Sequence, residues 1–159
     1  AIVGSAAAGD LGARKIREEL DALEVLGVDK VRTLVVPRVL ALTFAGVVLF
    51  FVNLLADISA TQIVDQWTVH LPLLPQIQAT FLAMNWYDVA AATLKNAILG
   101  FFIGIVACAK GLSAQGGAEG VGRAVNETVV ITFFGIWVIN SLYNTGYFTV
   151  VPESLSLLG

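Results

Sequence analysis

The sequence is poor in charge, cysteine and histidine, and each shortage excludes a class of protein. Charged residues make up only 13% of the chain, against about 25% in ordinary soluble domains. Nine Lys and Arg against twelve Asp and Glu argue against a basic nucleic-acid binder. One Cys cannot form an intrachain disulfide, and one Cys with one His argues against a dedicated metal site. Because no Ser/His/Asp or Cys/His set stands out, we expect no catalytic residue and no enzyme activity on this chain.

Apolar residues are abundant instead, at 57% of the chain with a mean hydropathy of +0.83, which excludes disorder. They gather in three runs of the length that crosses about 30 Å of hydrocarbon: 39–58, 89–109 and 128–147. The first contains one charge, Asp57, the second contains Lys95, and the third has none. Buried helices of large soluble proteins are also apolar all round, but this short chain has too little polar sequence to cover three. We therefore expect an all-α polytopic membrane protein, a helical bundle with three full transmembrane helices.

Lys and Arg lie on alternate sides of these spans. They occur before the first span and between the second and third, but not in 59–88 or 148–159. By the positive-inside rule, segment 1–38 and loop 110–127 should be cytoplasmic and the other two segments outside. Small residues near the amino end are typical of a closely packed helix end. We expect the chain to begin in the cytoplasmic end of a preceding transmembrane helix and to lack an amino-terminal portion.

Three polar or broken features near the spans call for an interpretation. Lys95 either snorkels toward the outer surface or acts by holding a lipid head group or pairing with Asp57. Arg38, just before the first span, is placed to snorkel to phosphate head groups. Segment 59–88 contains Pro72 and Pro75 and is too broken for another span, so we expect a short interfacial helix or an outer cap.

Residues 13–26 have the apolar period of an amphipathic helix. Ile16, Leu20 and Leu23 recur at helical spacing, Leu26 extends their face, and Gly27 is placed to end the helix. The charged faces carry Arg17, Glu18, Glu19, Asp21 and Glu24. Periodicity alone leaves two alternatives: a helix that presents acids to a groove of a partner, or a solvated helix at the membrane surface.

Two long motifs resemble the MlaE/YrbE permeases of MCE-type lipid ABC transporters, particularly the actinobacterial YrbE-like ones. The first is GSAAAGDLGARKIREELDALEVLGVDKVRTLVVPRVLA, and the second is CAKGLSAQGGAEGVGRAVNETVV. They lie on either side of a span, an outer segment and a span, and the resemblance covers essentially the whole chain. The sequence departs from the family pattern at Lys30, where proline is usual, and at Asp10, where glutamate is usual.

The resemblance implies a five-helix permease, of which this chain holds the end of the second span and the third to fifth. It implies a second permease subunit (the same or a related chain), a cytoplasmic ABC ATPase that binds ATP and Mg²⁺, an MCE assembly on the outer side, and no cofactor on this chain. The permease would lie in the cell inner membrane and move fatty acids, sterols or phospholipids. The alternative function is a membrane scaffold that anchors an outer complex without transport.

The resemblance also gives roles to particular positions. It implies that the acidic run and its arginine couple to the ATPase, namely Arg17, Glu18, Glu19, Asp21 and Glu24. It implies structural or interface roles at Pro37, Arg38, Gly116, Gly117, Arg123 and Asn126. Apolar candidates for the wall of a lipid cavity are Phe50, Phe51, Phe133, Phe134 and Trp137, which ordinary helix packing explains equally well.

Overall fold

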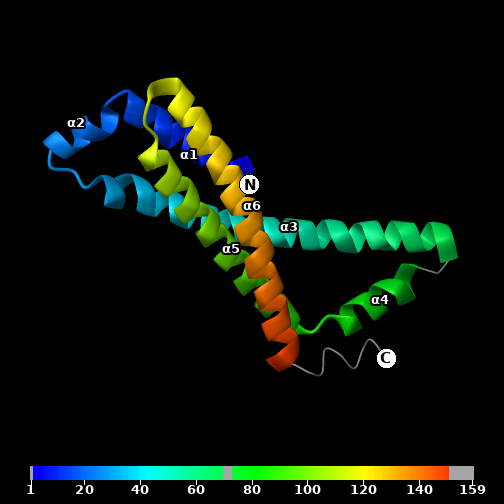
Figure 1. Cartoon of the computed structure of the whole chain (residues 1–159). Helices are drawn as coiled ribbons and strands as arrows, with labels where there is room; N and C mark the ends of the chain where they lie inside the picture. The colour runs from blue at the N-terminus through cyan, green and yellow to red at the C-terminus, as the bar shows by residue number, and fades with distance from the viewer. Residues whose placement is uncertain (1, 70–72, 151–159) are drawn as a thin grey trace.

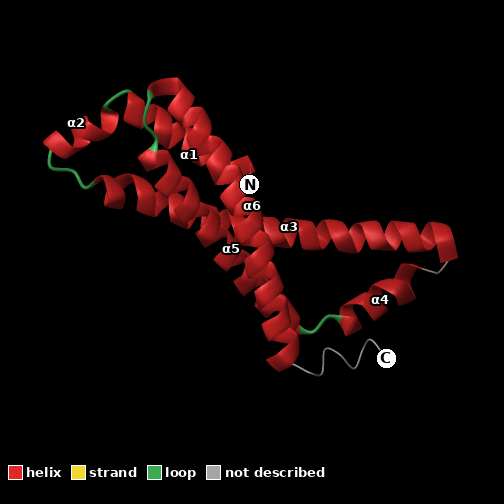
Figure 2. Cartoon of the chain, in the orientation of Figure 1, coloured by secondary structure: helices red, strands yellow, loops and turns green. Residues whose placement is uncertain are grey.

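The computed structural model describes residues 2–69 and 73–150, and the regular elements within these ranges are all helical. In chain order they are α1 Ile2–Ile16, α2 Glu19–Val25, the π-helical turn η1 Val31–Val35, α3 Val36–Val69, α4 Leu73–Ala83, α5 Trp86–Ser113 and α6 Gly117–Val150. Short connections join them (Figure 2). Three stretches are long and apolar enough to cross a membrane: Val31–Thr68, Trp86–Ser113 and Gly117–Tyr147. The expected all-α, multi-pass membrane architecture is confirmed.

Helix α5 is the centre of the bundle. Helix α1 packs against α5 and α6, and α3 packs against α5. Figure 1 shows α3 crossing the pair formed by α5 and α6, after which its second half projects away and α4 returns beneath it. A small buried apolar cluster of Leu11, Val39 and Cys108 lies where α1, α3 and α5 meet.

Glycines on α5 allow its neighbours to approach at backbone distance. A Cβ atom built on Gly100 would lie 2.7 Å from the carbonyl oxygen of Leu42 in α3. One on Gly104 would lie 3.0 Å from a backbone carbon of α3, and one on Gly111 would lie 2.8 Å from a backbone oxygen of α1. Gly100 and Gly104 form the small-xxx-small spacing that lets helices pack closely in lipid. The sequence alone did not predict these close contacts.

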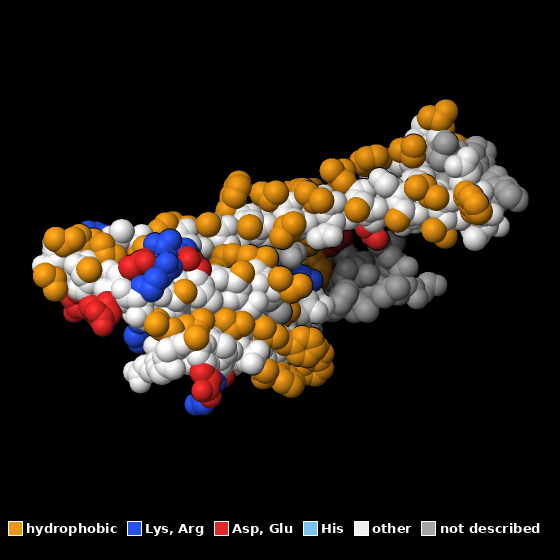
Figure 3. All heavy atoms as spheres, turned by 90° about the horizontal axis from the view of Figure 1, so that it is seen from above, with side chains coloured by type: hydrophobic (Ala, Val, Ile, Leu, Met, Phe, Trp, Pro, Cys, Tyr) orange, Lys and Arg blue, Asp and Glu red, His pale blue; other side chains and the backbone are white. Residues whose placement is uncertain are grey.

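Away from these contacts the spans expose large apolar side chains, as lipid-facing surfaces do. In α3, for example, Phe44 and Leu55 are exposed. Figure 3 shows hydrophobic side chains along the molecule, while most charged ones gather over the end formed by α2 and the carboxyl end of α1. The charged and the lipid-facing surfaces are thus separated along the bundle.

The helices extend beyond the expected spans. Helix α3 continues past Ile58 to Val69, because 59–69 contains neither glycine nor proline to end it. The expected loop 110–127 is helical except at 114–116. The turn there is made by Gly116 and Gly117, whose φ angles of +87° and +73° are ones that glycine adopts readily. Residues 70–72 of the expected outer segment and 151–159 of the expected tail lie outside the described residues.

Candidate functional site

The acidic residues of segment 18–24 lie on and beside α2, a short helix that does not continue α1. Helix α1 ends at Ile16, and Glu18 has a left-handed backbone with φ of 60°. Such a conformation costs a non-glycine residue about 1–2 kcal/mol, so packing must hold it. Leu20 supplies that packing, because its side chain is only 3% exposed in the bundle. The single helix expected over 13–26 is therefore broken at 17–18.

The far end of α2 is closed by backbone hydrogen bonds. The N–H of Gly27 donates to the carbonyl of Glu24, and the N–H of Val28 donates to that of Leu23 at 3.0 Å. With φ of +72° at Gly27, this is a Schellman ending, which confirms the prediction that Gly27 ends the helix. Asp29 then accepts hydrogen bonds from the backbone N–H groups that begin the next helix. A helix of seven residues is not stable alone, so these ends fix its position.

The five charged residues expected in coupling lie together on and beside α2. All of Arg17, Glu18, Glu19, Asp21 and Glu24 are exposed. Arg17 lies 3.3 Å from Glu19, and Lys30 donates to Glu24 at 2.9 Å. The hydrogen bond from Lys30 to Glu24 and the Glu24 charge raise the pKa of Lys30. The surface keeps a net negative charge because the four acids outnumber the two bases.

Two apolar side chains complete the tip of α2. Val25 is 88% exposed and Leu26 is 75% exposed. The helical period placed Leu26 on the apolar face with Leu20, but the Schellman turn carries it away from the bundle. Exposed apolar residues ringed by charge are typical of a surface that binds another protein. In the sequence, the only signal for the exposure of Val25 and Leu26 is the chain reversal expected at Gly27.

Arg38 connects α1 to the beginning of the first span. Its guanidinium pairs with the carboxylate of Asp10 in α1 and donates to the carbonyl of Ala7 at 3.3 Å. Desolvation raises the pKa of Asp10, but the hydrogen bond and charge of Arg38, with help from Arg14, outweigh it and lower that pKa below its ordinary value. Pro37 lies in the first turn of α3, directly after the π-helical turn, where its missing N–H is tolerated. In the structure Arg38 thus links α1 to α3, and its contact with phosphate head groups stays a prediction.

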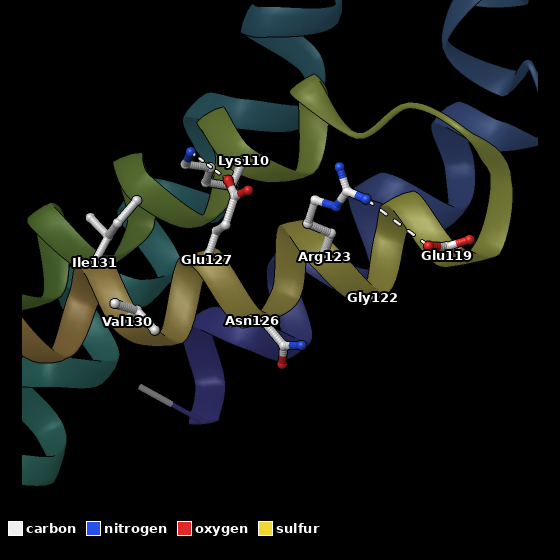
Figure 4. Close-up of a pocket in the computed structure, with 8 residues that line it drawn as sticks. All are labelled: Lys110, Glu119, Gly122, Arg123, Asn126, Glu127, Val130 and Ile131. Atoms are coloured by element: carbon white, nitrogen blue, oxygen red, sulfur yellow. Dashed lines mark hydrogen bonds and ion pairs between the residues drawn. The ribbon is translucent and has the colours of Figure 1, made fainter.

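A surface groove runs along the beginning of α6. Its volume is about 740 Å³, and Arg123 and Asn126 both line it. Figure 4 shows Lys110 of α5 reaching Glu127, which it pairs with at 2.7 Å, and Arg123 reaching toward Glu119 at 4.0 Å. The charges in the groove balance in pairs, so it is not an anion site. Gly116 and Gly117 form the turn that precedes the groove. A Cβ atom built on either glycine would have no neighbouring atom within 4 Å.

The aromatic cavity candidates do not share one site. Phe50 lines a cavity of about 310 Å³ between α3 and α5, whereas Phe51 lines a separate groove with Trp86. The other three candidates lie exposed on α6, namely Phe133, Phe134 and Trp137. Of these five aromatic residues, Phe50 alone lines the cavity, and the structure adds Asn53 and Asn96, two polar residues, to its wall.

Lys95 bonds a residue of α6 and not Asp57 of α3, one of the partners that the sequence left open. Its Nζ donates to Oδ1 of Asn144 in α6 at 3.3 Å, rather than reaching Asp57. An ammonium within an apolar span is costly unless it has a polar partner, and the amide oxygen of Asn144 accepts its hydrogen bond at this part-buried position. Among the described residues there is also no group of three His, Cys, Asp or Glu that could hold a metal ion.

The chain matches the family model for the permease MlaE over residues 1–145. It belongs to the MlaE permease family. The matched residues include α2, the Pro37–Arg38 pair and the second motif. The resemblance carried by the two motifs is therefore confirmed.

Curated relatives agree with the family. The chloroplastic protein TRIGALACTOSYLDIACYLGLYCEROL 1 of Arabidopsis thaliana is 29% identical over 96% of this chain and 44% of its own length. A probable ABC transporter permease of Synechocystis is 31% identical over 87% of this chain and 52% of its own. One from Rickettsia bellii is 28% identical over 93% and 57%. The chain spans about half the length of the curated relatives it matches.

Proposed function

We propose that this chain is the transmembrane permease subunit of an ABC-type lipid transporter. It moves hydrophobic lipids between the inner membrane and an MCE assembly on the outer side, and a separate ATPase supplies the energy. The observation that carries the proposal is α2, an acidic helix with an exposed apolar tip at the charged end of a lipid-exposed bundle. Membership of the permease family and relatives named as ABC transporter permeases support it.

The lipid part of the proposal has its own support. The plant relative is named after trigalactosyldiacylglycerol, which is a lipid. The first span and its neighbours leave a cavity lined almost wholly by apolar side chains, between helices long and apolar enough to cross a membrane. The charge distribution favours α2 on the cytoplasmic side and the carboxyl end outside. ATP and Mg²⁺ belong to the ATPase, and a second permease subunit completes the transmembrane unit.

Coupling would act through rigid contacts of α2. Leu20 fixes α2 to the bundle, and the Asp10–Arg38 pair fixes α1 to the beginning of α3. A displacement of α2 therefore moves α1 and α3 together instead of being lost in a flexible loop. A partner shifts such an equilibrium only if it binds the two states differently. We propose that α2 binds the open and closed ATPase dimers with different affinity.

Charge reversal at Glu18 and Glu19 tests the proposed coupling to the ATPase. In the full-length permease reconstituted with its ATPase, we expect Glu18→Lys with Glu19→Lys to abolish lipid-stimulated ATP hydrolysis. The physical reason is that two acids facing a partner become two repelling bases. Permease in the membrane fraction, measured by immunoblot, should stay at the wild-type amount.

A control outside α2 shows whether the effect of charge reversal is specific to that helix. Glu119→Lys reverses one exposed acid of α6 at the same end of the bundle, outside α2, and should leave the stimulation unchanged. The neutral pair Glu18→Gln with Glu19→Gln keeps side-chain size and should give a partial loss. Normal stimulation in the reversed pair would refute the coupling assignment. Purification of the permease with an outer complex but no ATPase would favour the scaffold instead.

A further inference from the structure

Amides in a membrane helix usually bond to a neighbouring helix, and two amides here do not. Asn53 donates through Nδ2 to the carbonyl of Leu49, and Asn96 donates through Nδ2 to the carbonyl of Ala92, both at 2.9 Å. Each bond stays within its own helix. Among the described residues no donor reaches either Oδ1 atom, so each amide keeps an acceptor and a second N–H for another molecule.

Both amides line the same cavity. Its volume is about 310 Å³ and its wall includes Asn53, Asn96, Phe50 and Ile103. The cavity extends along α3 from Leu42 to Asn53, which is about 16 Å of helix. Its volume is at the lower end of the roughly 300–1,000 Å³ that small-molecule pockets occupy. This size and shape fit one hydrocarbon chain rather than two.

The polar groups of the wall are neutral. Among the described residues that line the cavity none carries a charge. Lys95 is next to Asn96 in sequence, but its ammonium points to α6, where it bonds Asn144. A phosphate group would find no cation among the described residues that line the cavity. A hydroxyl or a protonated carboxyl group, in contrast, can both donate to Oδ1 and accept from the second N–H.

We infer that this cavity binds an uncharged single-chain lipid whose polar end is a hydroxyl or protonated carboxyl group, held by Asn53 and Asn96. This inference rests on the proposed lipid transport and names the chemical class that the site selects. The Gly46 and Gly100 contacts between α3 and α5 close the cavity on one side, because the helix backbones touch there. The hydrocarbon chain lies against Phe50 and Ile103.

Competition binding tests the inference in the full-length permease purified in detergent, without ATPase or ATP. The probe is a photoreactive long-chain alcohol, and labelled peptides are identified by mass spectrometry. We expect labelling within 42–53 and 96–103. Oleyl alcohol should compete about fivefold more strongly than oleyl methyl ether, since the ether lacks only the donor of one hydrogen bond. Lysophosphatidylcholine, with one chain and a phosphate, should compete more weakly than the alcohol.

Substitution of the two amides is the second arm. Asn53→Leu with Asn96→Leu should reduce the alcohol-to-ether ratio to about one. Asn140→Leu removes an amide of α6 that does not line the cavity and should keep the ratio. An equal affinity for alcohol and ether in the wild type overturns the inference without any variant. Labelling outside these segments, or equal competition by lysophosphatidylcholine, overturns it as well. Because ATP is absent, each of these failures leaves the ATPase test of the proposed function unaffected.

Discussion

Among the described glycines, Gly100 is the one where an added methyl group would come nearest to the backbone of another helix. A Cβ at Gly100 would lie 2.7 Å from the carbonyl oxygen of Leu42 and 3.0 Å from the Cα of Thr43. Both atoms belong to the backbone of α3, so no side chain can rotate to make room. The substitution Gly100→Ala must therefore push α3 away from α5 along their crossing.

The magnitude follows from two opposing effects. Forcing an extra methyl group into a packed contact typically costs about 1–3 kcal/mol. Replacing a helical glycine by alanine returns roughly 0.5–1 kcal/mol through the backbone. Gly146 of α6 is the matched control, because a Cβ there meets nothing within 4 Å. The backbone effect is common to both variants, so Gly100→Ala should be less stable than Gly146→Ala by about 1–3 kcal/mol.

Equilibrium unfolding of the full-length protein in mixed micelles with increasing SDS measures this difference. Tryptophan fluorescence and helical circular dichroism should give a lower midpoint for Gly100→Ala than for wild type. Gly146→Ala should match or exceed wild type. If Gly100→Ala is as stable as Gly146→Ala, the close crossing of α3 and α5 is refuted.

Two further substitutions test the polar contacts. Because Arg38 lowers the pKa of Asp10, the ion pair stabilises the folded chain above the ordinary value of 3.8 and loses this contribution as pH falls through the lower folded value. The difference in melting temperature between wild type and Asp10→Asn should thus be present at pH 7 and close below pH 3.8; a difference that persists in acid would contradict the pairing. Asn144→Leu leaves the ammonium of Lys95 without its acceptor and should cost about 1–3 kcal/mol more than Lys95→Met, which removes the charge. Equal unfolding free energies for these two variants would show that the amide does not pair with the lysine.

Much of the fold could be predicted because it depends on local composition. Runs such as 39–58 are long and apolar enough to require lipid wherever they pack, and a chain with three of them is helical because lipid offers the backbone no other partners. The helix end at Gly27 was also predictable, since glycine adopts a left-handed backbone there most readily. The acidic residues of α2 could be recognised as a candidate surface for a partner protein, and the two motifs identified the family.

The break at Glu18 could not be predicted, because a left-handed glutamate forms only when a buried neighbour such as Leu20 stabilises it. The aromatic candidates were likewise chosen by type, and in lipid residue type does not distinguish Phe50, in the cavity wall, from Phe133, on the exposed surface. What separates them is the face of the helix that meets a neighbour.

By itself, then, the sequence determined the number of spans, their helical state, the charged end and the family. The tertiary structure decided which helices meet, and with that the Asp10–Arg38 and Lys95–Asn144 pairs and the cavity at Asn53 and Asn96. The physical reason is that hydrocarbon is as apolar as the side chains it touches, so hydropathy drives a helix into the membrane but not against a particular neighbour. That choice depends on where Gly100 and Gly104 let two backbones touch.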